Sequence, residues 1–156
     1  APNKAAAEAL SDGTIKLPGM EGHLYLKPEK TFKDSRFDFY AEDETGRKAY
    51  IEVKGVTLEN NGVSSFPDAP TERGVKHVKE LIRASAEGFK AYVLFIIQMD
   101  GMKEFRPNDE THRQFGDALR EASEAGVEIL AYECQVGADY MTVKKSVPVN
   151  FFYETI

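Results

Sequence analysis

Hydrophobic and polar residues alternate along two runs within residues 33–56, and a short polar turn separates the runs. An alternation with a period of two is typical of β-strands, so this segment predicts a β-hairpin with strands over about 34–41 and 48–56. The predicted loop, 44–46, has three residues, and Gly46 supplies the left-handed conformation that a loop of this length requires.

The turn also determines which residues of the two strands face each other. If Asp43 pairs with Arg47, counting outward from that pair places Asp38 opposite Glu52, and Lys54 lies on the same face as both acids. The alternate positions are apolar and are expected to point into the core. They are Phe37, Phe39, Ala49, Ile51 and Val53.

Periodic apolar residues predict the other elements of the chain. Helices are expected over 3–12, 71–88 and 109–125, strands over 23–27, 89–98, 127–135 and 140–147, and loops over 57–70 and 99–108. The side chain of Asn3 is expected to cap the first helix. The predicted buried stripe of the second helix holds Val75, Val78, Leu81, Ile82 and Ser85, and another face holds Arg73, Lys76, His77 and Glu80.

The order of these elements indicates the fold class. The run over 89–98 is almost continuously apolar, which is typical of a strand buried on both faces of a largely parallel sheet. We expect a single α/β domain over 1–156, in which a mixed β-sheet is flanked by helices in three layers. Its core spans about 3–135, and a C-terminal strand and tail follow over 136–156. The apolar, aromatic tail is expected to pack on the sheet or to form a dimer or domain contact.

The charge of the chain limits the partners that it can bind on its own. The net charge is −6 and the pI is about 5.2, whereas a strong non-specific nucleic-acid binder needs a basic face. An acidic metal site would contribute part of this negative charge. The composition is therefore compatible with a nuclease, but not with tight binding of DNA by this chain alone.

Composition also bears on the cellular compartment. No apolar run approaches the ~18 residues that a membrane-spanning helix requires, and no secretory signal is visible. The single cysteine, Cys134, excludes an intrachain disulfide and lies in an apolar stretch. We therefore expect a cytoplasmic protein with no membrane partner, in which Cys134 is a buried, unreactive thiol.

The two opposed acids are the candidate chemical site. Carboxylates that face each other directly on neighbouring strands normally destabilise the pair. A divalent cation between Asp38 and Glu52 would remove this repulsion, and Mg²⁺ takes oxygen ligands from one or two carboxylates together with several waters. The alternative is a solvated hairpin face with mixed charges and no ligand. Asp38 followed by Glu52, Val53 and Lys54 resembles the metal site of the PD-(D/E)xK nucleases.

Longer strings of the chain resemble one protein family closely. They are SRFDF (35–39), EVK (52–54), VTL (56–58), FPDAPTERG (66–74), KH (76–77), EL (80–81) and Gln98. By these strings, of which FPDAPTERG is highly specific, the chain is similar to the sugar fermentation stimulation protein family from its first helix to about Gln135. It departs from that family at Gly55, where a serine is common, and at Met99, where an arginine that could contact phosphate is common.

The resemblance implies a restriction-endonuclease-like, PD-(D/E)xK fold, whose core order αβββαβ matches the predicted elements. Family members carry an OB-fold-like domain before the nuclease-like domain, so the chain resembles the C-terminal domain on its own. Contact with that missing domain, or a homodimer, is expected. The family is described as DNA-binding and named for an effect on sugar metabolism, and its fold implies a metal-dependent nuclease, a hydrolase of phosphodiester bonds in DNA or RNA.

Roles for individual residues follow from the same resemblance. Asp38 and Glu52 would bind Mg²⁺ or Mn²⁺ together with the backbone carbonyl of Val53, and Lys54 would orient the attacking water. Glu8 is a further candidate metal ligand, because related nucleases often take one from the first helix. Candidate contacts to nucleic-acid phosphate are Arg36, Arg73, Lys76, His77 and Gln98.

Two other functions remain open at this point. One is a DNA-binding regulator of sugar metabolism genes that keeps the nuclease fold without cleaving. The other is a metal-stabilised interaction domain that uses the aromatic tail as its contact. The intact set of Asp38, Glu52 and Lys54 favours the nuclease, because binding alone does not need that set.

Overall fold

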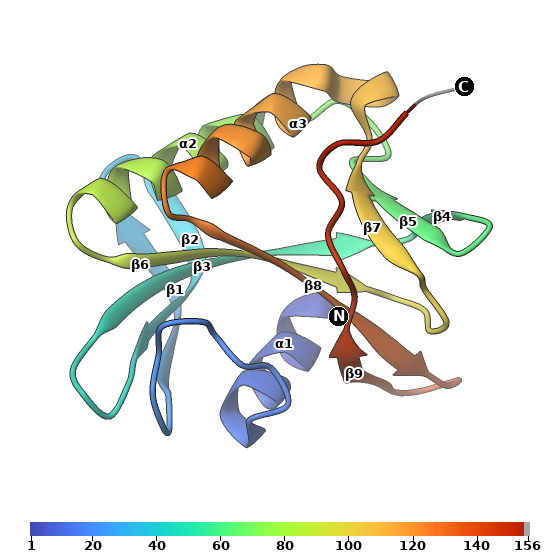
Figure 1. Ribbon diagram of the computed structural model, residues 1–156. Helices are drawn as coiled ribbons and strands as arrows, with labels where there is room; N and C mark the ends of the chain where they lie inside the picture. The colour runs from blue at the N-terminus through green and yellow to red at the C-terminus, as the bar shows by residue number, and fades with distance from the viewer. Residues whose placement is uncertain (155–156) are drawn as a thin grey trace.

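A mixed sheet of six strands forms the middle layer of the protein (Figure 1). The computed structural model describes residues 1–154, so the end of the predicted tail, 155–156, lies outside the described residues. In spatial order the strands are β1 (Tyr25–Phe32), β2 (Ser35–Glu42), β3 (Lys48–Val56), β6 (Lys90–Ile97), β8 (Glu128–Val136) and β9 (Met141–Ser146). The central strands β3, β6 and β8 run parallel, and β2 and β9 pair antiparallel with them.

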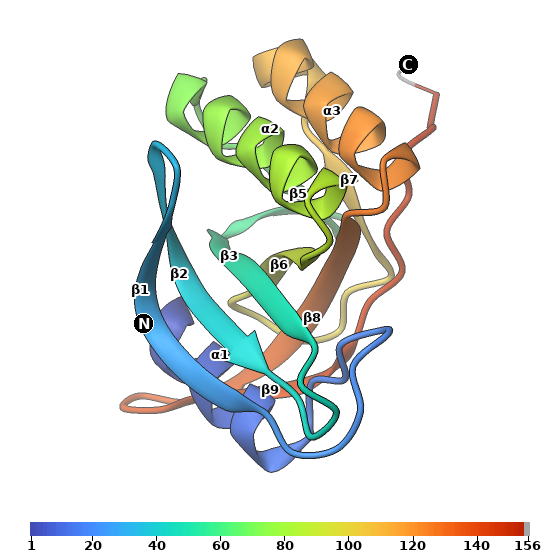
Figure 2. The same ribbon diagram turned by 90° about the vertical axis from the view of Figure 1, so that its left-hand side faces the viewer.

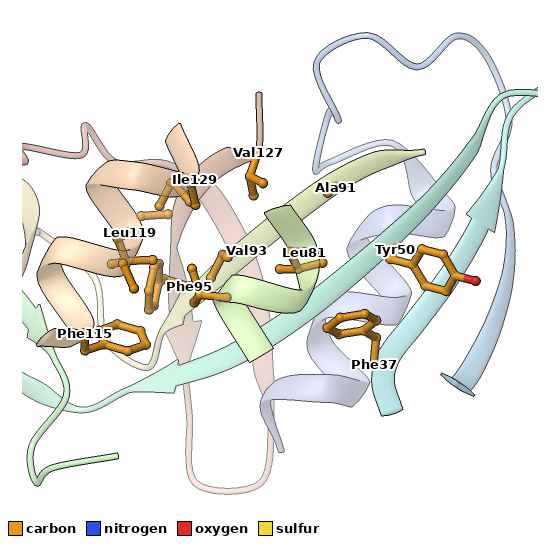
Figure 3. Packing of buried hydrophobic residues seen from close by; sticks show 14 of the residues in the cluster. Phe37, Tyr50, Leu81, Ala91, Val93, Phe95, Phe115, Leu119, Val127 and Ile129 are labelled. Atoms are coloured by element: carbon orange, nitrogen blue, oxygen red, sulfur yellow. The ribbon is translucent and has the colours of Figure 1, made fainter. Parts of the chain in front are cut away.

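Helices cover both faces of this sheet, as Figures 1 and 2 show. α2 (Glu72–Ala86) and α3 (Asp109–Glu124) lie side by side over one face, and α1 (Pro2–Asp12) lies against the other. Each face has its own hydrophobic cluster, one beneath α2 and α3 (Figure 3) and one against α1. The predicted arrangement of a mixed sheet flanked by helices is confirmed.

The almost continuously apolar run forms the centre of the sheet. All residues of β6 from Ala91 to Ile97 are buried, because β3 and β8 flank the strand and helices cover both of its faces. On the α2–α3 side, Phe95 stacks on Phe105 with ring centroids 4.3 Å apart, and Phe115 of α3 packs nearby (Figure 3). This rigid centre holds β3, which carries two of the predicted site residues.

The β2–β3 hairpin has the predicted register. Asp43 lies opposite Arg47, with the Asp43 N–H donating to the Arg47 carbonyl at 3.0 Å, and Gly46 has a φ of 88°. The ladder continues as far as Phe39 opposite Ile51. One residue beyond this last pair, the Asp38 side chain accepts a hydrogen bond from the N–H of Val53, the residue that follows Glu52.

The predicted apolar face of the hairpin is wrong at one position. Phe39, Ile51 and their neighbours pack against α1, but Phe37 packs on the opposite face, where its ring centroid lies 5.5 Å from that of Tyr50 and 6.0 Å from that of His77. The pairing of β2 with β3 ends at Phe39, so strict alternation does not extend to Phe37.

Both segments predicted as loops contain short strands. β4 (Leu58–Asn60) and β5 (Val63–Phe66) form a hairpin around the predicted turn at Asn61 and Gly62, and β7 (Glu104–Pro107) pairs in parallel with β5. These strands have three or four residues, and β5 also pairs with β7 from a distant part of the sequence, which the composition of the strands does not reveal. β1 also differs from the prediction, because it begins at Tyr25 and extends to Phe32.

Two expectations from composition can be compared with the structure. Among the described residues, the helices are all too short or too polar to span a bilayer. Cys134 is fully buried, as predicted, and burial, together with the nearby Glu133 carboxylate, raises the pKa of its thiol to about 11. The thiol is therefore protonated at neutral pH and unreactive as a nucleophile.

Candidate metal centre

The β2–β3 ladder opens at the first predicted acid, Asp38. Its Oδ2 accepts the Val53 N–H at 2.7 Å, so the carboxylate takes the place of a backbone partner where the strands separate. Its Oδ1 accepts a hydrogen bond from the side-chain amide of Asn3, with Nδ2 at 3.0 Å. Asp38 is half-buried, and both strands hold its carboxylate in a defined orientation at the edge of the opening.

The second acid, Glu52, is almost completely buried, with 3 % of its surface exposed. Its Oε2 contacts His77 Nδ1 directly and lies 3.3 Å from Lys54 Nζ. Its Oε1 is also buried and has no hydrogen-bond partner within residues 1–154. Leaving a buried carboxylate oxygen unpaired is costly, so a ligand at this oxygen would be stabilising. The solvated-face alternative is wrong, because Glu52 is not solvated.

Burial and three neighbouring side chains shift the pKa of Glu52, and they act in opposite directions. Burial raises this pKa most, the Lys54 ammonium lowers it, and the negative charge of Asp38 raises it. Asp38 raises it further through a hydrogen bond that Glu52 can donate only when it is protonated, while the His77 contact acts in the opposite direction. Because Asp38 Oδ2 accepts the N–H of Val53, the residue that follows Glu52, the two carboxyl groups lie near each other at the opening of the ladder.

The position of His77 corrects the predicted face of α2. His77 and Glu80 are buried, together with Val78 and Leu81, whereas the prediction placed them with the exposed basic residues. The sheet beneath this helix carries Glu52 and Lys54 as well as apolar residues, so a polar residue of α2 also faces inward. His77 lies against a predicted metal ligand rather than free to contact phosphate.

The other predicted phosphate contacts lie on the outside of the same region. Arg73 and Lys76 are exposed on the first half of α2, and Lys76 Nζ donates to the Asp34 carbonyl at 3.1 Å. Arg36 is exposed on β2 and forms an ion pair with Glu29, with Nη2 and Oε2 2.7 Å apart. Figure 2 shows that the β1–β2 turn and α2 stand next to each other, and the hydrogen bond from Lys76 to the Asp34 carbonyl joins them.

Glu8 is not brought to the two acids. It is exposed on α1 and lines an open groove of about 420 Å³ together with Lys4, Gln98 and Tyr140. Within residues 1–154, no three side chains of the types His, Cys, Asp and Glu are grouped closely enough to hold a metal ion. The structure thus provides a pair of acids, and the predicted third carboxylate faces the groove instead.

Asn3 is the residue of this site that the sequence did not reveal. It was expected to cap α1, but the helix begins at Pro2 with Ala1 as its N-cap, and no side chain makes a capping hydrogen bond there. Gly55 permits this placement, because a Cβ at that position would lie 2.7 Å from Pro2 Cγ and 2.8 Å from Gln98 Nε2. Gly55 is therefore the residue of β3 that permits the close approach of α1.

The donor atoms at this opening suit a hard divalent cation. Asp38 and Glu52 present carboxylate oxygens from adjacent strands, and Glu52 Oε1 has no hydrogen-bond partner among residues 1–154. The N–H and C=O of one strand residue point to the same side, so the Val53 carbonyl is directed toward β2 like its N–H. Mg²⁺ keeps several waters, so two carboxylates are enough to bind it.

Comparison with known sequences gives a consistent set of relatives. The family model described as the sugar fermentation stimulation protein RE domain matches residues 1–140. Sugar fermentation stimulation protein homologs of Clostridium acetobutylicum and Clostridium beijerinckii are 51% identical over 148 residues and 56% identical over 147 residues. The matches cover 95% and 94% of this chain but 64% and 63% of the relatives, so the chain spans less than two thirds of their length.

A solved structure is also similar to this chain. It is that of SfsA from Pyrococcus furiosus in complex with Ca²⁺. The two structures superpose with a TM-score of 0.86 at 28% sequence identity, and the match covers 96% of this chain and 64% of the other. The similarity therefore extends over nearly all of the fold described above.

Proposed function

The chain belongs to the sugar fermentation stimulation protein family, and on this premise we propose that it is a metal-dependent, nuclease-like domain that hydrolyses phosphodiester bonds in DNA or RNA. One observation carries the proposal. The buried Oε1 of Glu52 has no hydrogen-bond partner among residues 1–154, Asp38 accepts the N–H of the next residue, Val53, and Lys54 Nζ is 3.3 Å from the other oxygen of Glu52. This is the arrangement of an acid pair and an amine that phosphodiester hydrolysis uses.

In the proposed site, Asp38 and Glu52 hold Mg²⁺ or Mn²⁺ together with the Val53 carbonyl. When bound, such a cation polarises the scissile phosphate and lowers the pKa of a coordinated water. Lys54 is held in place by Glu52, so its ammonium can orient water and offset the negative charge that develops on the phosphate oxygens. His77 fixes the Glu52 carboxylate through Oε2, which keeps Oε1 available for the cation.

Two further observations support the proposal. The related structure from Pyrococcus furiosus is a complex with Ca²⁺, a cation that takes oxygen ligands like those of this site. Apart from the short strands β4 and β5 between β3 and α2, the order α1, β1, β2, β3, α2, β6 is the element order of the PD-(D/E)xK core, with the acids on its second and third strands. We propose this fold for the chain on that basis.

The proposed substrate is nucleic acid, with DNA preferred. Arg73 and Lys76 are exposed on α2 and Arg36 is exposed on β2, and these side chains would contact phosphates. The net charge of −6 implies that this chain alone holds nucleic acid weakly. The remaining third of the full-length relatives would then supply additional affinity.

A cleavage assay tests the proposal. Labelled single- and double-stranded DNA and RNA oligonucleotides are incubated with the protein in Mg²⁺, Mn²⁺ or a chelator, and products are separated on denaturing gels. The wild type should cleave only with the cation. Asp38→Asn and Lys54→Gln should each lose roughly a hundredfold or more in rate, whereas Lys48→Gln, an exposed lysine on the same strand, should not. Wild-type rates in both site variants would contradict the proposal.

The same assay separates the alternative function. A DNA-binding regulator that does not cleave would retard the oligonucleotide in a native gel and leave it intact under every cation condition. In that case, Lys54→Gln would bind the oligonucleotide like the wild type, and neither protein would produce cleavage products. Cation-dependent cleavage that is lost in Lys54→Gln would exclude this alternative.

A further inference from the structure

Asn3 makes its side-chain contact with a residue 35 positions away, at the centre of the proposed cation site. Its Nδ2 donates to Asp38 Oδ1 at 3.0 Å, although both residues are accessible to solvent and water could replace this bond. The other Asp38 oxygen is already used by the Val53 N–H. Each carboxylate oxygen has two lone pairs, so Asp38 can still bind a cation, and the Asn3 amide lies at the oxygen that the Val53 N–H does not use.

The two ends of the Asn3 amide have opposite chemistry. The nitrogen donates hydrogen bonds, which suits a bare carboxylate, whereas the oxygen accepts them and is a ligand for Mg²⁺ and Ca²⁺. A rotation of the terminal amide by half a turn exchanges the two ends without moving the backbone. Without a cation, the amide nitrogen can donate a hydrogen bond to Asp38. With a cation bound to Asp38, the amide oxygen can face that cation.

The site also has room for a neutral oxygen ligand. Within residues 1–154, no third acidic or histidine side chain joins Asp38 and Glu52 in a group that could hold a metal. Glu8, the other oxygen-bearing candidate on α1, lines the groove with Lys4 and Gln98 and makes no hydrogen bond to either acid among the described residues. Asn3 is the residue through which α1 reaches the acid pair.

From this geometry we propose that Asn3 is a positioning residue and oxygen donor of the cation site. It holds Asp38 through its amide N–H in the absence of a cation, and it presents its carbonyl oxygen to the bound cation or to a water on that cation. This inference rests on the proposed function, because it requires that Asp38 binds a cation. It assigns to the first turn of α1 a role in selecting and retaining the metal.

Three variants test the role of Asn3, with cation affinity measured by isothermal titration of Mn²⁺ and Ca²⁺. Asn3→Leu removes both ends of the amide and should weaken binding about tenfold. Asn3→Asp keeps an oxygen ligand and adds charge, so it should bind at least as tightly as the wild type. Glu8→Gln, on the same helix but facing the groove, should bind like the wild type.

A second measurement distinguishes this role from a purely structural one. In cation-free buffer, Asn3→Asp places a second carboxylate beside Asp38, so its melting temperature should be lower than that of Asn3→Leu. Saturating Ca²⁺ should reverse this order. If Asn3 only fastened α1, Asn3→Asp would remain the less stable variant with Ca²⁺, and both variants would bind cations like the wild type. That result would overturn the inference.

The Asp38→Asn variant separates failure of this inference from failure of the proposed function. If Asp38→Asn abolishes cation binding while Asn3→Leu binds like the wild type, only the role of Asn3 is wrong. If Asp38→Asn binds cations like the wild type, the proposed metal site itself is wrong, and the role of Asn3 is overturned with it.

Discussion

Glu52 has a buried carboxylate whose two oxygens differ in their contacts. His77 and Lys54 both contact Oε2, and Oε1 has no partner within residues 1–154. In the absence of a ligand this arrangement costs stability, which is why burial raises the pKa of Glu52. The proposed cation would bind at the oxygen that this arrangement leaves without a partner.

His77 should matter for stability because it pairs with a buried acid. Replacing His77 by leucine leaves Lys54 as the only partner of Glu52 Oε2, and the unfolding free energy should fall by about 1–3 kcal/mol. Urea denaturation in cation-free buffer measures this change. Lys79→Ala, an exposed position on the same helix, should stay within about 0.5 kcal/mol of the wild type. Equal stability of the two variants would contradict the account of His77.

The sequence predicted some site residues and missed others for definite reasons. Asp38, Glu52 and Lys54 lie in one hairpin, where strand alternation and turn length determine which residues meet. His77 was placed on the exposed face because helix periodicity ranks apolar residues as buried and cannot detect a buried acid beneath the helix. Asn3 was assigned a local capping role, because no pattern within α1 refers to a partner on β2.

At the scale of elements, the turn that sets the hairpin register is itself held by an acid. Asp43 is buried and accepts hydrogen bonds from the N–H groups of Glu21, Thr45 and Arg47 and from the Thr45 hydroxyl. Burial raises the pKa of Asp43, but these hydrogen bonds outweigh it and lower the pKa to about 2. The carboxylate form therefore stabilises the turn that aligns the two strands of the proposed metal site.

This gives a pH-dependent prediction for Asp43→Asn. The folded pKa is about 2, below the value of about 3.9 for an unfolded aspartate, so the ionised group stabilises the fold above pH 4. That stabilisation is lost as the pH falls from about 4 toward 2. The difference in unfolding free energy between wild type and variant should be largest above pH 5 and shrink over this window. A difference that is constant from pH 6 to pH 2 would contradict the assignment.

Long elements were predicted well because their periodicity is strong. The positions of α2, α3, β3, β6 and β8 follow from apolar runs and stripes, and the parallel centre of the sheet follows from the fully apolar run of β6. The small sheet of β4, β5 and β7 was missed, because its strands are short and pair only after the chain has folded. Phe37 packs on the opposite face from the predicted one because the pairing of β2 with β3 ends at Phe39, and the sequence of the turn does not determine where that pairing ends.

At the scale of the whole molecule, the cation site lies where all three layers meet. The hairpin supplies the acids, α2 supplies His77 from one face of the sheet, and α1 supplies Asn3 from the other. In the proposed site, a bound cation would offset part of the net charge of −6 and favour the approach of phosphate. The full-length relatives are longer than this chain, and the parts that they add would act on a centre that is built entirely from residues described here.

Soaking crystals of the protein in Mn²⁺ and recording anomalous diffraction tests the shared cation most directly. The account predicts one strong peak at the opening of the β2–β3 ladder, about 2.0–2.6 Å from oxygens of both Asp38 and Glu52. The peak should be absent from crystals of Asp38→Asn. Full occupancy at another site, with no peak between these two acids, would contradict the account.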